Sequence, residues 1–357
     1  MTRHYHRLRA LSHKRFFWWI TIPALVFITS IYGLFFLRNP VEYAEKETHP
    51  RETMLIVPPN ATMKQIADSL KTQGIIRSEI TFRAAAKLMR AGHGIHGGTF
   101  QIHRGLSNYQ LLQDIIGQKY QIIFALSIPE GFRLKDVADA AAASLGVNTV
   151  DFIRAAGDTA YLHWLGLPAQ AKTAEGYLYP DTYKWNYPLN GRTLLQSLVT
   201  HFHQAVPDTL LDNAAQLGLT PYDALKIASI VEGETKNDSE RYLIAGVYEN
   251  RFRIGMKLQA DPTVQYGLQL DRPITHRDIL KPTPYNTYLK TGLPPGPINN
   301  PSFDAIYAAL HPAQTDYLFF VARRDGSRTH FFSATYDGQL QNIKKEEHNI
   351  ASGVRER

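Results

Sequence analysis

The sequence predicts an α+β protein with a single N-terminal transmembrane helix, a small strand-and-helix subdomain and a larger mixed α/β domain. Three observations lead to this prediction. An uncharged apolar run lies near the amino terminus, a strand, turn and helix pattern then occurs twice, and amphipathic helical stretches alternate with long loops later on. The 357 residues are enough for about two folded units beyond an anchor.

The amino-terminal end of the chain is basic, whereas the remainder is nearly neutral. Arg3, Arg7, Arg9, Lys14 and Arg15 supply five of the +7 net charges and leave +2 for the rest. A basic tail of this kind is weak support for nucleic-acid binding, so we expect no nucleic-acid partner. The sequence contains no cysteine, which excludes a disulfide scaffold, a thiolate nucleophile and a Cys-ligated zinc.

Residues 16–37 are uncharged and mostly apolar, with aromatic residues at both ends. At about 1.5 Å per residue this segment can cross a hydrocarbon core of about 30 Å. The positive charges of residues 1–15 predict a cytoplasmic amino terminus, an inner-membrane anchor and a periplasmic remainder. A cleaved signal peptide is the alternative, but the run is longer than usual and lacks a small-residue cleavage pattern. Residues 38–51 are polar and are predicted to be a linker.

A partial internal repeat follows the linker. Val57–Asp68 aligns with Ile128–Asp139, and Phe82-Arg-Ala-Ala loosely recurs within Phe152-Ile-Arg-Ala-Ala. Each copy is typical of a short strand ending at proline, a turn and an amphipathic helix. The turns contain Asn60 and Gly131, and the helices are expected to start near Thr62 and Leu134.

This order of elements is similar to a LysM-type carbohydrate-binding module, although two βα units can share turn chemistry without sharing a function. We therefore expect a LysM-like subdomain over residues 52–125. Three histidines in it, His93, His96 and His103, have neither an acidic neighbour nor a usual zinc spacing. We expect a turn at 93–98 and a strand at 99–103, with no metal and no cofactor. A helix capped by serine or asparagine is predicted from Ser107 to Ile116.

The stretch from Pro221 to Gly267 is predicted to carry the chemistry. Leu225, Ala228, Ser229 and Glu232 share one face at helical spacing, so a helix here would bury the Glu232 carboxyl group. Burial disfavours the charged form of a carboxyl group, and this adjusts it toward the work of a general acid near neutral pH. The alternative is an ordinary surface glutamate near the end of a helix.

Glycine and a second carboxylate follow Glu232 directly. Gly233 is expected to end or loosen the helix, and Glu234 is expected to point to a different, solvated side. Further helices are predicted over 194–205 and over 239–253, the latter ending with Asn250 and Arg251.

Several loops have the composition of a sugar-binding groove. Tyr177 and Tyr179 lie in the aromatic stretch 175–183, where rings near carboxylates could stack on sugar faces, although a packed loop at the core edge is the alternative. Beyond Gly255 the chain is expected to be irregular over 258–267, 284–288 and 292–301, in loops able to present a site. In those loops Gln259 and Asn286 can each donate and accept hydrogen bonds.

The carboxy-terminal part is predicted to hold a buried strand over 317–322. It is expected to pair with a strand over 330–333 across the turn at 323–327. From Lys344 onward the chain is charged, and its last residues are expected to fray.

Several of these motifs, spaced in order along the chain, resemble the YceG-like family, the MltG-type endolytic murein transglycosylases. The resemblance covers nearly everything after the anchor. Its most specific pieces are Ala228-Ser-Ile-Val-Glu-Gly-Glu-Thr235, Asn250-Arg251, Leu258-Gln-Ala-Asp-Pro-Thr-Val264 continuing to Gly267, Tyr285-Asn-Thr-Tyr288 and Gly292-Leu-Pro-Pro-Gly-Pro-Ile298.

The resemblance implies a membrane-anchored enzyme that cuts peptidoglycan glycan strands internally, with Glu232 as its single catalytic residue. It implies a catalytic domain over 126–349, followed by a charged tail at 350–357, and at the family level a peptidoglycan synthase as partner. The residues expected to bind substrate are Asn250, Gln259, Asp261, Thr263, Tyr285, Asn286, Tyr288, Tyr177 and Tyr179.

Two departures from the family pattern concern the carboxy-terminal edge of the site. The family often has Glu-His shortly after the final strand, but here Tyr336-Asp337-Gly338 follows Thr335 and the pair appears only at Glu347-His348. Ser302 follows Asn300-Pro301 where glycine is frequent in the family.

In the mechanism that the resemblance implies, Glu232 protonates the glycosidic oxygen between MurNAc and GlcNAc. It then accepts the proton of the MurNAc C6 hydroxyl, which attacks C1 and leaves a 1,6-anhydro end. A two-carboxylate muramidase is the alternative, with Glu234, Glu240 or Asp261 as the second group and reducing ends as product. A glycan-binding scaffold without catalysis is a third hypothesis.

Overall fold

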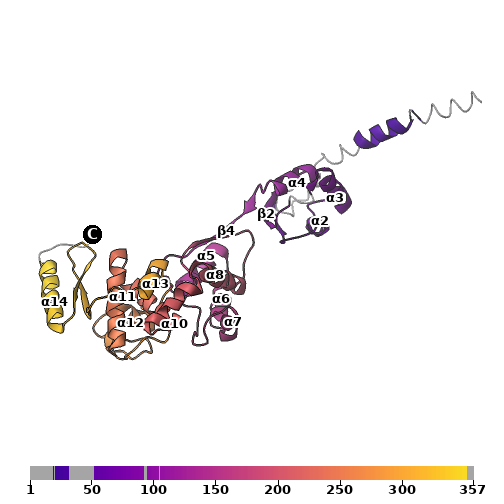
Figure 1. Ribbon diagram of the computed structural model, residues 1–357. Coiled ribbons are helices and arrows are strands. Elements are labelled where there is room, and N and C mark those ends of the chain that lie inside the picture. The colour runs from indigo at the N-terminus through magenta and orange to yellow at the C-terminus, as the bar shows by residue number, and fades with distance from the viewer. Residues whose placement is uncertain (1–18, 20, 32–51, 92–94, 104, 352–357) are drawn as a thin grey trace, which may run out of the picture. The chain divides into compact units, whose positions relative to one another are not determined.

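The structure is a computed structural model that describes residues 19, 21–31, 52–91, 95–103 and 105–351 (Figure 1). The chain forms two compact units. The first contains residues up to Phe124 together with Trp185–Pro188, and the second contains Ala125–Lys184 and Leu189 onward. The predicted boundary between 125 and 126 lies one residue from this division. The four residues Trp185–Pro188, however, belong to the first unit rather than to the larger domain.

Most of the predicted transmembrane segment 16–37 lies outside the described residues, as do the tail 1–15 and the linker 38–51. Within the part of the chain that the structure describes, every helix is too short or too polar to span a bilayer. The anchor therefore stays a prediction. His93 and Gly94, the first two residues of the predicted turn at 93–98, also lie outside the described residues.

The first unit has a strand, two helices and a returning strand. The antiparallel strands β1 and β2 pair from Glu52 with His103 to Val57 with Gly98, and β3 extends the sheet beside β2. Phe82 and Phe100 are fully buried in the core beneath the helices. The elements are β1 Glu52–Val57, α2 Met63–Thr72, α3 Glu79–Leu88, β2 Gly98–His103, α4 Asn108–Ile116 and β3 Gln121–Ile122.

The predicted helix starts in this unit are confirmed, and the structure shows their cause. Thr62 caps α2, and Ser107 caps α4, each through a reciprocal pair of hydrogen bonds with the glutamine three residues on. Asn60 adopts a positive φ of 59° in the turn before α2, and Gly131 adopts 75° in the matching turn of the second copy. The repeat predicted from the sequence therefore has the same backbone feature at both turns.

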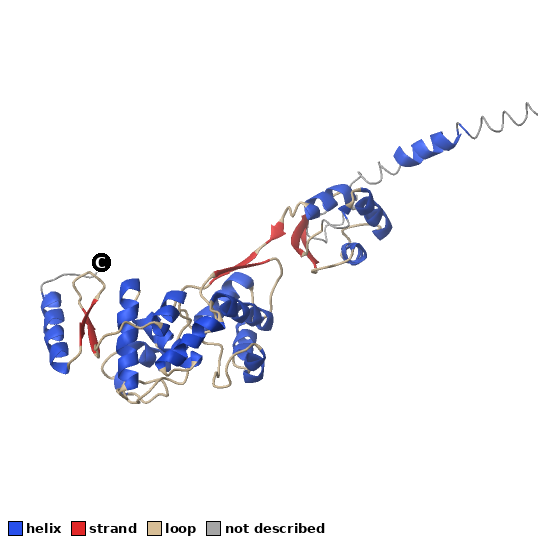
Figure 2. Ribbon diagram, viewed as in Figure 1, coloured by secondary structure: helices blue, strands red, loops and turns tan. Residues whose placement is uncertain are grey.

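The second unit is mainly helical, with two small two-stranded sheets (Figure 2). Together with the first unit it confirms the α+β class. Its elements are β4 Phe124–Ser127, α5 Leu134–Leu145, α6 Thr149–Ala156, α7 Thr159–Trp164, β5 Thr182–Trp185, α8 Gly191–Ala205, α9 Asp208–Leu211, η2 Asp212–Leu217, α10 Pro221–Glu234, α11 Asp238–Arg253, α12 Asp261–Gly267, η3 Asp278–Leu280, α13 Phe303–Leu310, β6 Phe319–Ala322, β7 His330–Ser333 and α14 Tyr336–Ala351.

Helix α10 is the centre of this unit, because α11, α12 and α13 all pack against it. It begins where the sequence predicts, with Thr220 as cap, Pro221 in the first turn and Asp223 closing the capping box. Its buried residues lie on more than one face: Tyr222, Ala224, Leu225, Ile227, Ala228, Ser229, Ile230, Val231 and Glu232. The site at its end is therefore built into the core.

Two predictions about the elements are wrong, and one helix was not expected. Residues 261–267 form α12 instead of an irregular loop, because Asp261 and Pro262 are favourable residues for the first turn of a helix. The strand β6, which was expected to be buried, is half-buried, although it pairs with β7 as predicted. The chain from Tyr336 to Ala351 forms the long helix α14, which packs on both strands and was not expected from the sequence. The last residues, which were expected to fray, lie outside the described residues.

Candidate active site

Glu232 lies in the last turn of α10 with its side chain fully enclosed, at 0% exposure. The predicted burial is thus confirmed. Its Oε2 atom accepts two hydrogen bonds from Ser302, one from the backbone amide at 3.1 Å and one from the hydroxyl group at 2.6 Å. Ser302 is the residue at which the sequence departs from the family's frequent glycine, and it contacts the candidate acid directly.

The other oxygen of Glu232 faces two cations. Its Oε1 atom lies 3.4 Å from Lys236 Nζ and 3.8 Å from Arg241 Nη2. These positive charges, together with the donors of Ser302, favour the ionised carboxylate, whereas burial opposes it. The Glu232 carboxyl group therefore has hydrogen-bond donors at both of its oxygens.

Arg241, on α11, is buried among four carboxylates. Its Nη2 atom lies 3.6 Å from Glu130, and its Nη1 atom lies 3.1 Å from Asp238 and 3.7 Å from Asp304. Its Nε atom has no hydrogen-bond partner among the described residues. The sequence reasoning missed Arg241. The only local signal was an acidic residue three positions before it, which is also common on exposed helices.

The turn of the second repeat passes directly beside Glu232. A Cβ atom at Gly131 would lie 3.6 Å from Glu232 Cγ and 3.6 Å from Lys236 Nζ, and the backbone there has positive φ. The amide of Gly131 donates to the carbonyl oxygen of Asn300 at 3.0 Å. Glycine at this position therefore serves both the turn and the close approach to the carboxyl group.

Asn300 is fully buried and joins three segments around the site. Its Oδ1 atom accepts hydrogen bonds from the amides of Gly176 and Leu178, both at 2.9 Å. Its Nδ2 atom donates to the carbonyl oxygen of Phe132 at 2.8 Å and to Glu175 Oε1 at 3.1 Å. One side chain therefore positions the Gly131 turn, the aromatic stretch and the loop that carries Ser302.

Glu175 is a second buried carboxyl group of this region. Both of its oxygens accept a hydrogen bond from the amide of Leu134, the first residue of α5, at 2.9 and 3.1 Å. Burial raises the pKa of Glu175 to about 8, against the lowering effect of that amide and of Tyr266. Sequence reasoning noted the motif that contains Glu175 but did not single out this residue.

The three carboxylates proposed as alternative second groups each have another partner. Glu234 was expected to be solvated but is half-buried: Tyr248 Oη donates to it at 2.7 Å, and burial raises the pKa of Glu234 to about 7. Glu240 accepts from the amide of His330 at 2.8 Å and contacts its ring nitrogen Nδ1 at 2.7 Å. Asp261 accepts a short hydrogen bond from Tyr288.

Three of the predicted substrate-binding residues are buried and hydrogen-bonded within the protein. Asn250 donates to two backbone carbonyl groups of the segment before β6, at residues 315 and 317. Thr263 bonds to the carbonyl oxygen of Ala260 and to the hydroxyl group of Thr287. Asn286 donates to two carbonyl groups, at residues 279 and 281. In this structure these polar groups hold the loops that surround α10 and α12.

The aromatic candidates lie in different surroundings. Tyr177 is buried against Phe202, 4.8 Å between ring centroids, and burial raises its pKa. Tyr179 is half-buried, and Asp304 and Glu130 lie near enough to raise its pKa further, after burial and Asp181. Among the predicted binding residues, Tyr179 thus lies near carboxylates that share Arg241 with Glu232.

The remaining candidates lie in or beside the loops after α11. Gln259 is exposed and has a positive φ of 51°. Tyr285 packs against Tyr266, with ring centroids 4.8 Å apart. Tyr288 is half-buried and bonds to Asp261.

Within the described ranges, the side chains of His, Asp and Glu nowhere gather in a group of three or more that could hold a metal ion. In the first unit, His103 lies instead beside Glu52, with 3.4 Å between Nδ1 and Oε1.

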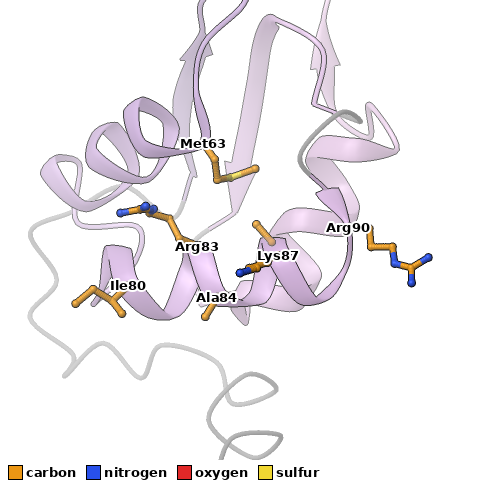
Figure 3. A pocket seen from close by; sticks show the side chains of 7 residues that line it. Met63, Ile80, Arg83, Ala84, Lys87 and Arg90 are labelled. Atoms are coloured by element: carbon orange, nitrogen blue, oxygen red, sulfur yellow. The ribbon is translucent and has the colours of Figure 1, made fainter.

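The first unit has an open pocket of its own, of about 640 Å³, between α2 and α3 (Figure 3). Ile80, Ala84 and Lys87 follow one side of α3, and Met63 lies across from them at the start of α2. Arg83, Ala86 and Arg90 complete the lining, which therefore contains both apolar and basic side chains.

The fold and the site define a class of protein: an α+β protein whose candidate active site has an enclosed glutamate at the end of a buried helix. The chain belongs to the YceG-like family, whose family model matches residues 55–345. It is 30% identical over 305 residues to the endolytic murein transglycosylase of Bacillus subtilis, which covers 81% of this chain and 83% of that protein.

Two further relatives support this assignment. The endolytic murein transglycosylase of Streptococcus pneumoniae strain D39 is 27% identical over 300 residues and matches 74% of this chain. The chain spans about half of that longer relative, 53% of its length. A crystal structure of a yceG-like protein from Listeria monocytogenes has 26% identity and a TM-score of 0.57, covering 82% of this chain and 98% of that chain.

Proposed function

We propose that this protein is an endolytic lytic transglycosylase that cuts the β-1,4 bond between MurNAc and GlcNAc within peptidoglycan strands. The observation that carries the proposal is the enclosed Glu232 carboxyl group, held by Ser302 and facing Lys236 and Arg241. The relatives named endolytic murein transglycosylase support the same activity.

Glu232 would act twice in one cycle. As an acid it donates a proton to the glycosidic oxygen while the bond from that oxygen to C1 of MurNAc breaks. As a carboxylate it then takes the proton of the MurNAc C6 hydroxyl group, whose oxygen bonds to C1 and closes a 1,6-anhydro ring. The glutamate ends in its starting form, and the proposed cycle consumes no water.

The neighbours of Glu232 suit this exchange of roles. Ser302 and the two cations stabilise the carboxylate that exists after proton donation, while enclosure favours the acid that starts the next cycle. Because Ser302 occupies Oε2, we assign the proton transfers to Oε1, the oxygen beside the Gly131 turn.

A hydrolase is the second candidate function, and one contact favours it. Arg241 Nη2 lies within 4 Å of both Glu130 and Glu232, so a second carboxylate with 51% side-chain exposure borders the site. If Glu130 activated a water molecule, the products would have reducing ends. This carboxylate was not among the three expected from the sequence.

The test is mass spectrometry of products from purified sacculi digested by residues 52–357, which include both compact units. We expect anhydro-muropeptides from the wild type and from Glu130→Gln, and their loss in Glu232→Gln. Reducing ends that vanish in Glu130→Gln would instead establish the hydrolase. If wild type and Glu232→Gln both bound sacculi and neither released fragments, the protein would be a glycan-binding scaffold.

The remaining parts of the proposal concern location and partners. A single-pass anchor at 16–37 would hold the enzyme in the inner membrane with both compact units in the periplasm. The strand, helix, helix, strand order of β1, α2, α3 and β2 supports a LysM-like role for the first unit. A peptidoglycan synthase is the proposed protein partner, which co-purification from membranes would test.

A further inference from the structure

A second cavity, of about 450 Å³, opens in the second unit beside Glu175, and we call it the Glu175 pocket. Its walls come from the start of α5, from Ile153 on α6, from the end of α12 and from Tyr285. Ligand pockets commonly have volumes of about 300–1,000 Å³, so this cavity is large enough to hold one or two sugar rings.

The surfaces of the Glu175 pocket suit a sugar ring. The rings of Tyr266 and Tyr285 are tilted by 60° at 4.8 Å, and the Ile153 side chain adds an apolar wall. Aromatic and aliphatic surfaces pack on the C–H faces of sugars, while the ring edges need hydrogen-bonding groups. Gln269, an exposed residue of the lining, supplies such groups, and burial raises the pKa of Glu175 to about 8, which disfavours a charged carboxylate in the wall.

The charges at the rim argue against an anionic ligand. Arg133 already pairs with Asp271 at 2.8 Å and with Asp136 at 3.4 Å, and Lys135 lies 3.9 Å from Asp271. Each cation of the lining thus has a carboxylate beside it. A ligand carboxylate or phosphate would have to displace one of these pairs, whereas a neutral ligand would not.

The Glu175 pocket and Glu232 border the same stretch of backbone. Leu134 donates its amide to Glu175, and Gly131, three residues earlier, lies against Glu232. Asn300 bonds to Glu175 with its side chain and to the Gly131 amide with its carbonyl oxygen. The backbone turn at 131–134 therefore connects the pocket with the candidate acid.

We propose that the Glu175 pocket binds an uncharged sugar unit of the glycan strand close to the pair of sugars cut at Glu232. In a strand that alternates GlcNAc with peptide-bearing MurNAc, the uncharged unit is GlcNAc. This inference rests on the proposed function for its substrate, and the pocket would fix how the strand lies relative to Glu232.

The test is calorimetric titration of the full-length chain carrying Glu232→Gln, which prevents cleavage, with tetra-N-acetylchitotetraose. A second substitution, Ile153→Trp, should fill the pocket from a position that is already 40% exposed. We expect Ile153→Trp to weaken binding at this site by about tenfold or more. Ile254→Trp is the matched control, because Ile254 is 59% exposed and lies outside the pocket lining, and it should leave binding unchanged.

Hydrogen exchange with the same sugar locates the site. Protection should appear over residues 133–145 and 261–271 in the Glu232→Gln chain and be lost with Ile153→Trp. Protection confined to the first unit, or equal binding by both tryptophan variants, would overturn the proposal. The proposal would also be overturned if the chain did not bind the neutral sugar but bound a peptide with free carboxylates in a parallel titration. Because this readout needs no cleavage, it is independent of whether the wild type makes anhydro ends.

Discussion

At the scale of single residues, the candidate site is a glutamate with two differently occupied oxygens. Ser302 holds Oε2 with its amide and hydroxyl groups, while Oε1 faces Lys236 and Arg241. A carboxyl group held by one oxygen keeps a fixed direction and can still exchange a proton through the other. Two substitutions test this arrangement.

Ser302→Ala should lower the turnover rate by about 10- to 100-fold. The lost hydrogen bond from the hydroxyl group stabilises the carboxylate that forms as the proton leaves, and bonds to charged groups contribute about 1.5–3 kcal/mol. Release of anhydro-muropeptides with time measures the rate.

Ser302 also caps α13, so the control must lose a cap as well. Ser107→Ala removes the cap of α4 in the first unit and should cost about 1 kcal/mol of stability without affecting turnover. Equal turnover in the two variants would contradict the role of Ser302.

Arg241→Met should lower the free energy of unfolding by about 3 kcal/mol, because it leaves the enclosed Glu232 with less compensating charge. Denaturant unfolding of the second unit measures the change. Arg154→Met is the control, because its ion pair to Asp151 is exposed. This substitution should lower the free energy of unfolding by less than about 1 kcal/mol. Similar losses in both variants would mean that Arg241 does not compensate a buried charge.

The sequence was sufficient to single out Glu232, but not the residues around it. Helical spacing places the carboxyl group on a buried face because that inference needs only neighbours within two helical turns, from Leu225 to Ser229. Ser302 and Asn300 come from a loop some 70 residues later, and Arg241 from the next helix. Such contacts depend on how α10, α11 and α13 pack, which no local pattern contains.

At the scale of elements, Gly233 was expected to end or loosen helix α10, and this prediction is wrong. The helix continues to Glu234, and a Cβ atom at Gly233 would lie 2.8 Å from Pro262 Cβ. Glycine is required here for the close approach of α12, rather than to end α10. Because α12 was not expected from the sequence, Gly233 was interpreted as a helix-ending glycine, which is the common role of glycine near the end of a helix.

Gly233→Ala should therefore destabilise the second unit by about 1–3 kcal/mol through overpacking, even though alanine favours helices. Thermal unfolding checks this. Gly157→Ala, where the added Cβ would be 3.6 Å from its nearest contact at negative φ, should change stability little. An increase in stability for Gly233→Ala would show that α12 moves aside easily.

The carboxyl group of Glu234 should make the stability of the folded protein depend on pH. The pKa of Glu234 rises from 4.5 to about 7 on folding, so the folded state binds more protons than the unfolded state between these values. Its contribution is complete below about pH 4.5 and is lost as the pH rises through about 7.

Glu234→Gln should therefore flatten the fall in stability between pH 5 and pH 8 by about 1–3 kcal/mol. Denaturant unfolding at these two pH values measures the difference. The exposed Glu347→Gln serves as control. An unchanged slope in Glu234→Gln would show that the group is already ionised in the folded protein.

At the scale of the whole molecule, the sequence predicted the repeat but not how its copies are used. The strand and helices β1, α2 and α3 form the first copy, in the first unit, and β4, α5 and α6 form the second copy, which leads into the second unit. In the second copy the Gly131 turn lies beside Glu232. Similar turns therefore occur at Asn60 in the first unit and at Gly131 beside Glu232, and only the tertiary structure shows which one borders the candidate site.

The predicted anchor gives a test at the same scale. The full-length chain should stay in the membrane pellet after extraction with alkaline carbonate, because a spanning helix resists it. Residues 52–357 expressed without the first 51 should be recovered in the soluble fraction. Release of the full-length chain by carbonate would contradict a spanning anchor, and recovery of a shortened mature chain would indicate a cleaved signal peptide.

The brief return of the chain to the first unit at Trp185–Pro188 limits how this protein can be recombined. The carbonyl oxygen of Asn186 accepts a hydrogen bond from Thr99 at 2.8 Å, so the first unit is completed by residues encoded far downstream. The first unit therefore cannot be exchanged between genes as one continuous segment by a single crossover. A chimera would have to carry both segments, and the two units are expected to be inherited together.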